Sequence, residues 1–135
     1  MSRLLLLPTF AALLVCLVLL VAPTASQARG GGDDDEVRTS GTCGGGARSE
    51  LRLEADDGTI ETRFEVRGAR TGSWRVVIVQ ERRVVWRGTV RPDGGSRSLR
   101  VERDLDDLPG ADEIMFRAVG PRGVTCSASG TLSGG

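Results

Sequence analysis

From residue 50 onward, apolar and polar residues alternate along the chain with the period of a half-buried β-strand. Leu51 and Phe64 belong to two such runs, which flank a turn signal at residues 56–59. The pattern predicts a β-hairpin over residues 50–67 with one dry face and one solvated face. Glutamate and arginine share the solvated face, where we expect them to pair across the strands.

Two later runs, residues 74–79 and 84–90, are apolar on both faces, which is typical of central strands or of strands whose second face is covered. A three-residue connection from Glu81 to Arg83 places both tryptophans on one face, whereas a two-residue connection separates them. We favour the first connection because it makes one side strongly apolar. That side then holds Trp74, Val76, Ile78, Val84, Trp86 and Val90.

Alternation continues over residues 98–105, 113–119 and 124–128, with turn signals between these runs. No segment after residue 28 keeps a helical period for three turns. Counted from residue 50, the chain offers seven strands at regular short spacing, which is typical of a sandwich. The sequence therefore predicts an all-β domain over residues 42–132, folded as a seven-stranded antiparallel two-sheet sandwich.

The N-terminal segment has the pattern of a secretory signal peptide. A short basic start precedes an apolar run from Leu4 to Ala22, and small residues lead up to Ala28. We predict that residues 1–28 are cleaved off and that the protein is secreted. In the alternative, the apolar run stays in the membrane as an anchor, because it is just long enough to span the bilayer. Pro8 shortens the uninterrupted run, which favours cleavage.

Residues 29–41 follow the signal segment and contain a glycine run and then the four acidic residues 33–36. Such a segment has little to bury, so we predict a flexible acidic and glycine-rich spacer. A calcium site is the alternative for residues 33–36, but consecutive carboxylates lack the alternating spacing of a Ca²⁺ loop.

Two of the three cysteines, Cys43 and Cys126, remain after the predicted cleavage. Export places them in an oxidising compartment, where an even number of cysteines indicates a disulfide framework. We therefore predict a single Cys43–Cys126 bridge. A two-cysteine metal site would lack histidine partners and the usual CxxC spacing.

The strand pattern over about residues 50–130 resembles the fibronectin type III and immunoglobulin-like superfamily. The resemblance is carried by Trp74 on the third strand, the tight link to the fourth strand, and residues 108–119 followed by a turn and a last strand. Two features depart from the immunoglobulin pattern. The cysteines are not on the second and sixth strands, and a tyrosine corner is impossible because the chain has no tyrosine. We expect the bridge to fasten a short N-terminal segment to the final strand.

The composition excludes most catalytic chemistry. The 18 basic residues are all arginine and balance 18 acidic residues, and lysine, histidine and asparagine are absent as well. The chain therefore has no imidazole base or ligand and no amine nucleophile. A two-carboxylate hydrolase would need a long groove, for which the chain has little material. We expect no enzyme activity and no cofactor, and zero net charge disfavours nucleic acid as a partner. Arginine without lysine also looks like the coding bias of a high-G+C bacterium.

The second face of the 74–90 hairpin is the candidate partner-binding surface. If the tryptophans point inward, valines and arginines point outward, and a neighbouring sixth strand adds three more residues. An apolar patch rimmed by arginine suits protein binding. In the alternative, the valines simply suit a strand and arginine stems cover them. The candidate residues are Arg75, Val77, Val79, Val85, Arg87, Met115, Arg117 and Val119.

These observations predict a secreted, non-catalytic extracellular binding or structural module, whose partner is an extracellular protein or a cell-envelope component. The alternatives are a small-ligand carrier or protease inhibitor of the β-sandwich type, or a membrane-anchored version of the same module. The acidic segment Asp104–Glu113 offers oxygen ligands for Ca²⁺ but contains no complete ligand motif, so no metal site is predicted.

Overall fold

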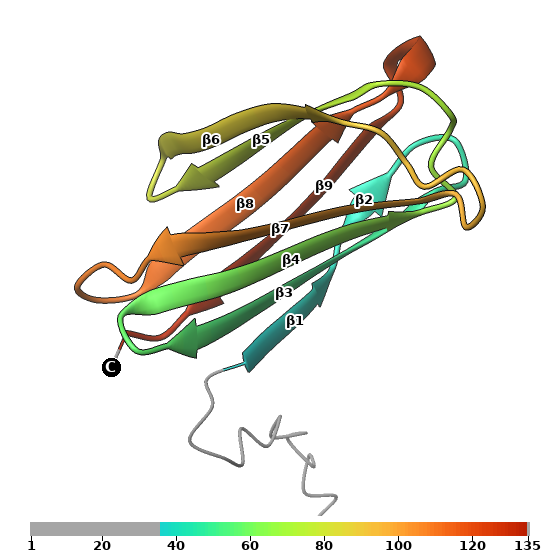
Figure 1. Cartoon of the computed structure of the whole chain (residues 1–135). Helices are drawn as coiled ribbons and strands as arrows, with labels where there is room; N and C mark the ends of the chain where they lie inside the picture. Colours follow the sequence, from blue (N-terminus) through green and yellow to red (C-terminus); the bar gives the residue numbers. More distant parts are fainter. Residues whose placement is uncertain (1–35, 135) are drawn as a thin grey trace, which may run out of the picture.

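The computed structural model describes residues 36–134, which form two antiparallel β-sheets packed face to face (Figure 1). The predicted signal segment and residues 29–35 of the predicted spacer lie outside the described residues. The elements are β1 (Glu36–Ser40), β2 (Thr42–Cys43), β3 (Arg48–Asp56), β4 (Thr59–Arg67), β5 (Trp74–Gln80), β6 (Arg83–Val90), β7 (Ser98–Asp106), β8 (Asp112–Val119), the short 3₁₀ helix η1 (Pro121–Gly123) and β9 (Thr125–Leu132).

The strands divide into a four-stranded sheet in the order β1-β3-β4-β7 and a five-stranded sheet in the order β2-β9-β8-β5-β6. The prediction of an all-β two-sheet sandwich is confirmed, and this architecture is compatible with an immunoglobulin-like or fibronectin type III fold. The seven predicted strands are β3 to β9. Within residues 36–134, no helix is long and apolar enough to cross a membrane.

The N-terminal strand β1 corrects the sequence analysis, which assigned residues 36–41 to the spacer. Val37 and Thr39 are half-buried and alternate with exposed residues, and β1 pairs with the edge of β3. Five residues give only two inward positions, and this short alternation directly follows an acidic run. The sequence pattern was therefore too short to indicate a strand.

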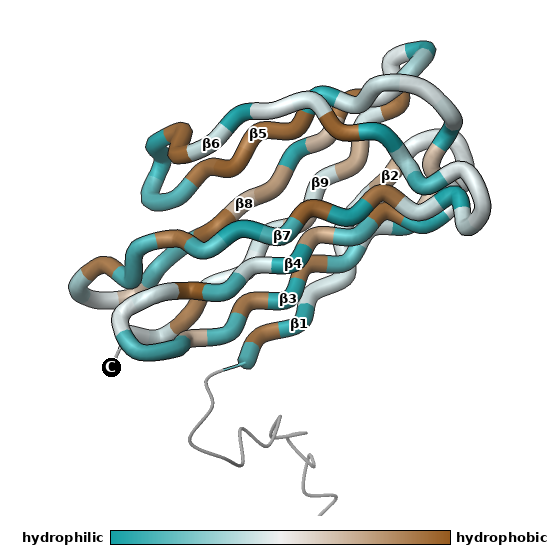
Figure 2. The backbone as a smooth tube through the Cα atoms, viewed as in Figure 1, coloured by the Kyte–Doolittle hydropathy of each residue, from teal (hydrophilic) through white to brown (hydrophobic). Residues whose placement is uncertain are grey.

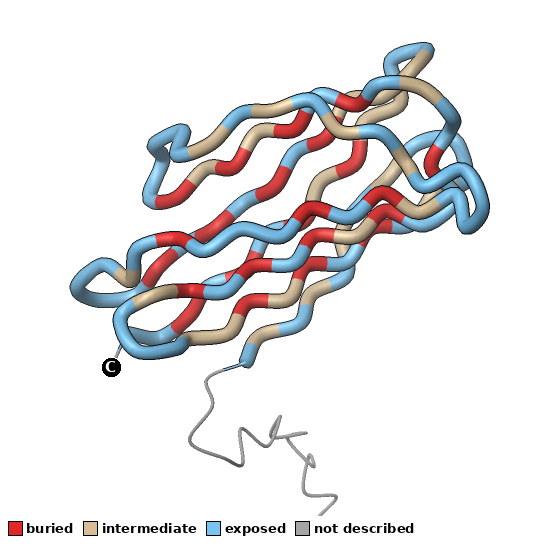
Figure 3. Tube along the Cα trace, viewed as in Figure 1, coloured by how far each residue is buried: buried red, intermediate tan, exposed pale blue. Residues whose placement is uncertain are grey.

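The first hairpin, β3–β4, forms as predicted. Asp57 and Gly58 have φ angles of 42° and 84°, as expected for a two-residue turn that matches the twist of the strands. Alternate residues of both strands are buried, which Figure 3 shows as red positions along each tube. At the centre of the core, Phe64 of β4 stacks on Phe116 of β8, with ring centroids 5.2 Å apart.

The second hairpin, β5–β6, differs from the prediction in its turn. Glu81 and Arg82 form a two-residue connection with φ angles of 48° and 63°, so the predicted three-residue connection is wrong. A β-bulge then restores the predicted faces, because Val85 is an extra residue between the pairs Val79–Val84 and Ile78–Trp86. The two tryptophans therefore share the inward face as predicted.

Val84 is the exception on this hairpin. It lies opposite Val79 on the outer face and is 45% exposed, whereas the sequence analysis placed it with the tryptophans. The bulge follows Val84 and shifts the alternation of every later residue of β6 by one position. A period-two count that runs straight through residues 83–90 therefore assigns Val84 to the wrong face.

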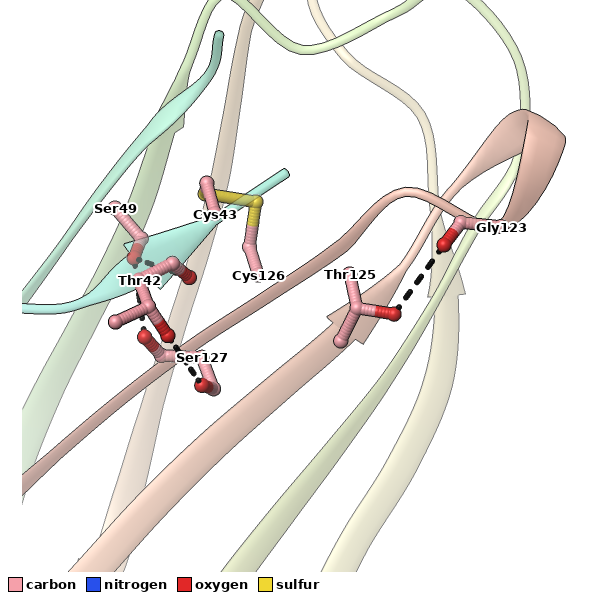
Figure 4. The surroundings of a disulfide bond; sticks show 7 residues. All are labelled: Thr42, Cys43, Ser49, Gly123, Thr125, Cys126 and Ser127. Atoms are coloured by element: carbon pink, nitrogen blue, oxygen red, sulfur yellow. Dashed lines mark hydrogen bonds between the residues drawn. A yellow bond between two sulfur atoms is a disulfide. The ribbon is translucent and has the colours of Figure 1, made fainter. Parts of the chain in front are cut away.

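The disulfide is confirmed: Cys43 and Cys126 are bonded at 2.05 Å and lie directly opposite each other on β2 and β9 (Figure 4). Both cysteines belong to the five-stranded sheet, so the bridge lies within one sheet and fastens the N-terminal segment to the last strand. Between β1 and β2 the chain passes from one sheet to the other at Gly41. The bridge thus holds β2 in the five-stranded sheet next to the residue at which the chain changes sheets.

Candidate functional site

The outer face of the five-stranded sheet carries apolar and arginine side chains in adjoining rows. Val77 of β5 lies between Arg87 of β6 and Arg117 of β8, because it is the direct partner of both. Two residues along β5, Arg75 lies between Thr89 and Val119. On the other side of Val77, Val79 lies between Val84 and Met115. We call this surface the arginine–valine face: Arg75, Val77, Val79, Arg87, Met115, Arg117 and Val119.

The register thus brings seven of the eight predicted residues together. The eighth, Val85, is the extra residue of the bulge at the sheet edge and is 44% exposed. Val84 was missed as an outer residue, although the two-residue turn at Glu81 and Arg82 places it directly opposite Val79. Figure 2 shows the underlying sequence signal, since β5 is hydrophobic along most of its length while β3 and β4 alternate.

The arginines of this face surround a depression of about 610 Å³ that is open to solvent. Residues from three adjacent strands line it, and two of them, Gly88 and Thr89 on β6, are small. Gly88 also accommodates Trp86 on the inner side, since a Cβ at this glycine would overlap the indole ring. The depression is lined by Arg75, Val76, Val77, Arg87, Gly88, Thr89, Arg117 and Val119.

The three arginines of this face form no salt bridge within residues 36–134. Glu113 is the acidic residue of β8 on the same side, and it lies four positions from Arg117, about 13 Å along the strand. Its main-chain N–H donates to the carboxylate of Glu81 in the β5–β6 turn at 2.7 Å. The positive charge of the face therefore has no internal counter-charge beside it.

The outer face of the four-stranded sheet is different, because five of its six arginines form salt bridges with glutamate. Direct partners on β3 and β4 carry the same charge, so the predicted pairing across this hairpin is wrong: Glu50 faces Glu65 and Arg52 faces Arg63. The salt bridges run instead along single strands or to β1 and β7, as between Arg63 and Glu102 at 2.6 Å. The paired arginines are Arg38, Arg52, Arg63, Arg67 and Arg100, and the sixth is Arg48.

Glu65 provides a test of this internal neutralisation. Hydrogen bonding from Arg67, together with the charges of Arg67 and Arg100, lowers the pKa of Glu65. The stabilisation is therefore present above the pKa of the unfolded chain and is lost as the pH falls through the folded pKa. We expect Glu65→Gln to lower the free energy of unfolding by about 0.5–1 kcal/mol at pH 7 and by less at pH 2, measured by urea denaturation.

Glu61→Gln is the matched control, because Glu61 lies on the same strand and face but forms no salt bridge with a described residue. Its replacement should not lower stability at pH 7. An equal loss for Glu65→Gln at both pH values would contradict the electrostatic explanation and indicate disturbed packing.

The acidic segment Asp104–Glu113 contains a structural carboxylate. Asp112 is 1% exposed and accepts hydrogen bonds from the Gln80 side chain at 2.7 Å and from the Leu108 N–H at 3.1 Å. Desolvation, followed by the hydrogen bond and charge of Asp112, raises the pKa of Asp107. Residues 36–134 contain no group of three or more histidine, cysteine, aspartate or glutamate side chains that could hold a metal ion. Asp112 therefore anchors the β7–β8 loop to β5.

Comparison of the chain with protein-family models finds no match, and neither do comparisons with curated proteins and with solved structures. The two outer faces differ in how the charge of their arginines is compensated. On the four-stranded sheet glutamates neutralise most of the arginines, whereas the arginines around the depression on the five-stranded sheet have no acidic partner among the described residues.

Proposed function

We propose that this protein is a secreted, non-catalytic binding module of the immunoglobulin-like or fibronectin type III class, and that it binds an extracellular protein or a cell-envelope component through the arginine–valine face. The observation that carries the proposal is the combination of half-buried valines and the exposed Met115 with three arginines that lack salt bridges to described residues. Burial of the apolar groups supplies binding energy, and the guanidinium groups supply directional hydrogen bonds.

The position of the face in the fold also suits binding. β5 has paired neighbours on both sides, β6 and β8, and its inward residues Trp74, Val76 and Ile78 are fully buried. The backbone of such a strand is held by the core, so no rearrangement of the sheet is needed when a partner binds. Met115 and Val84, at 37% and 45% exposure, extend the apolar area beyond the depression.

The secreted location is supported by two independent features. The N-terminal segment has the pattern of a signal peptide. The Cys43–Cys126 disulfide is typical of proteins that fold in an oxidising compartment. Together they favour a partner that is also outside the cytoplasm.

A small-ligand carrier is the second candidate function. The depression of about 610 Å³ falls within the size range of small-molecule sites and has both apolar and cationic lining residues. The carrier proposal predicts a low-molecular-mass ligand in native mass spectra of the purified protein, whereas the binding-module proposal predicts a macromolecular partner.

Val77→Asp tests the binding module. The new carboxylate would lie between Arg87 and Arg117 on the outer face, so we expect the fold to be retained while the apolar centre is lost and the positive charge is partly neutralised. We expect at least tenfold less partner to be captured from secreted and envelope fractions of the source organism, measured by quantitative mass spectrometry with immobilised protein.

Thr131→Asp is the matched control, because Thr131 is exposed on β9 of the same sheet, opposite Glu113 and away from the depression. Its capture should equal that of the wild type, and circular dichroism should show both variants folded. Unchanged capture and unchanged self-association by a folded Val77→Asp protein would contradict the proposed function.

A further inference from the structure

The arginine–valine face has a chemical asymmetry that specifies its partner more closely, provided that this face is the binding site proposed above. We infer that Arg75, Arg87 and Arg117 bind carboxylates, and that the partner presents an extended protein segment in which acidic side chains adjoin apolar side chains on the same face. The inference is carried by the spacing of the three arginines, by the missing counter-charge, and by the order of the rows along the strands.

The three arginines lie close enough to bind one segment. Arg87 and Arg117 flank Val77 on neighbouring strands, where direct partners have Cβ atoms about 5 Å apart. Arg75 lies two residues from Val77 along β5, about 7 Å away. Each arginine side chain is long and flexible, and its planar guanidinium can bind a carboxylate through two parallel hydrogen bonds. Carboxylates on adjacent alternate positions of one extended chain can therefore reach all three.

The charge balance favours an acidic partner. Five of the six arginines on the other sheet have glutamate partners, whereas none of these three has an acidic partner among the described residues. Three like charges on adjoining positions repel one another, and a ligand carboxylate relieves that repulsion. A second copy of the same face cannot do so, because none of the residues in its three rows carries a carboxylate.

The order of the rows gives the sequence pattern of the partner. Arg75 lies in the first row and Arg87 with Arg117 in the second, while Val84, Val79 and Met115 make up the third. Rows on one face are two residues apart, which is also the spacing of same-face side chains in an extended peptide. A segment lying along the strands therefore places acidic residues over the first two rows and an apolar residue over the third.

Short synthetic peptides test this order directly. The probe is a peptide with both ends blocked and the sequence Glu-Ser-Glu-Ser-Leu-Ser-Leu. In one comparison peptide both glutamates are replaced by glutamine. In the other, the second glutamate and the first leucine are exchanged. Binding to the oxidised protein is followed by amide chemical shifts in an NMR titration at 50 mM salt. We expect the probe to shift amides of β5, β6 and β8, and each comparison peptide to bind at least tenfold more weakly.

The double variant Arg87→Gln with Arg117→Gln should weaken probe binding at least tenfold. The control is Arg48→Gln, which removes an exposed arginine from the other sheet that also lacks a salt bridge, and it should change the affinity less than twofold. Raising the salt concentration to 300 mM should weaken the probe severalfold and leave the glutamine peptide unchanged.

The outcomes separate this inference from the proposed function. Equal binding of the glutamate and glutamine peptides, lost in Val77→Asp, would overturn the carboxylate site and leave a binding module with an apolar partner. Unchanged probe binding by the double variant would also overturn it, as would self-association of the protein through this face. If the probe does not bind and Val77→Asp captures partners as the wild type does, both the inference and the proposed function fail.

Discussion

Replacing both Cys43 and Cys126 by alanine should lower the free energy of unfolding by about 4 kcal/mol. The bridge joins residues separated by 83 positions, so its removal releases a long loop and increases the conformational entropy of the unfolded chain. The folded state changes little, because the two residues are direct partners on β2 and β9 and alanine fits both positions. Typical domains have only 5–15 kcal/mol in total, so this loss is a large share of the stability.

Urea denaturation measures this difference, and the midpoint of thermal unfolding should fall by roughly 20 °C. The wild-type protein in a strong reducing agent should match the double variant. Thr42→Ala is the control on the same strand pair, because it removes the contact between the Thr42 and Ser127 hydroxyl groups at 3.2 Å and keeps the bridge. It should cost less than about 1 kcal/mol. A double alanine variant as stable as the Thr42→Ala protein would contradict the stabilising role of the bridge.

Local sequence rules were sufficient for the larger part of the fold. The first hairpin was predictable because alternation over 50–67 and the Asp57-Gly58 turn agree on one register. The disulfide was predictable because only two cysteines remain after the predicted cleavage. What these features share is that the deciding residues are neighbours in the sequence, or that no alternative partner exists.

The rest depends on pairing that the sequence does not display. The turn at Glu81 and Arg82 has positive φ angles without glycine or asparagine, so turn chemistry gave no sign of its length. The bulge at Val85, which brings Trp86 back to the inward face after the two-residue turn, also has no signal in the sequence. The tryptophans were placed correctly because the apolar content of one face outweighed the error in the turn.

The candidate site shows the same division. Seven of its residues follow from alternation in three strands, once the neighbour of β5 is identified as β8. Its charge balance does not follow, because like charges face each other across β3 and β4 and opposite charges meet along strands. Which arginines remain unpaired is decided by the register and by neighbouring strands, and so only the folded structure distinguishes the two faces.

Gly41→Ala should destabilise the fold by about 3 kcal/mol or more, which is the upper range for overpacking in a well-packed core. At this residue the chain crosses between the sheets, and a Cβ would overlap the carbonyl oxygen of Ser127 and the hydroxyl of Ser49. Neither can move aside easily. Ser127 pairs with Thr42 beside the disulfide, and the Ser49 hydroxyl donates to the Ser127 carbonyl at 3.1 Å.

The matched control for this substitution is Gly44→Ala, because a Cβ at Gly44 meets no atom within 4 Å. Urea denaturation of the two variants should therefore differ by several kcal/mol although both add a single methyl group. The N–H of Gly41 donates to the Ser49 carbonyl at 2.9 Å, so amide exchange at this position should also accelerate when β1 and β2 separate from the sandwich. Equal stability of the two variants would contradict the close packing at the crossing. A large difference would make Gly41 the residue that lets one N-terminal segment complete both sheets.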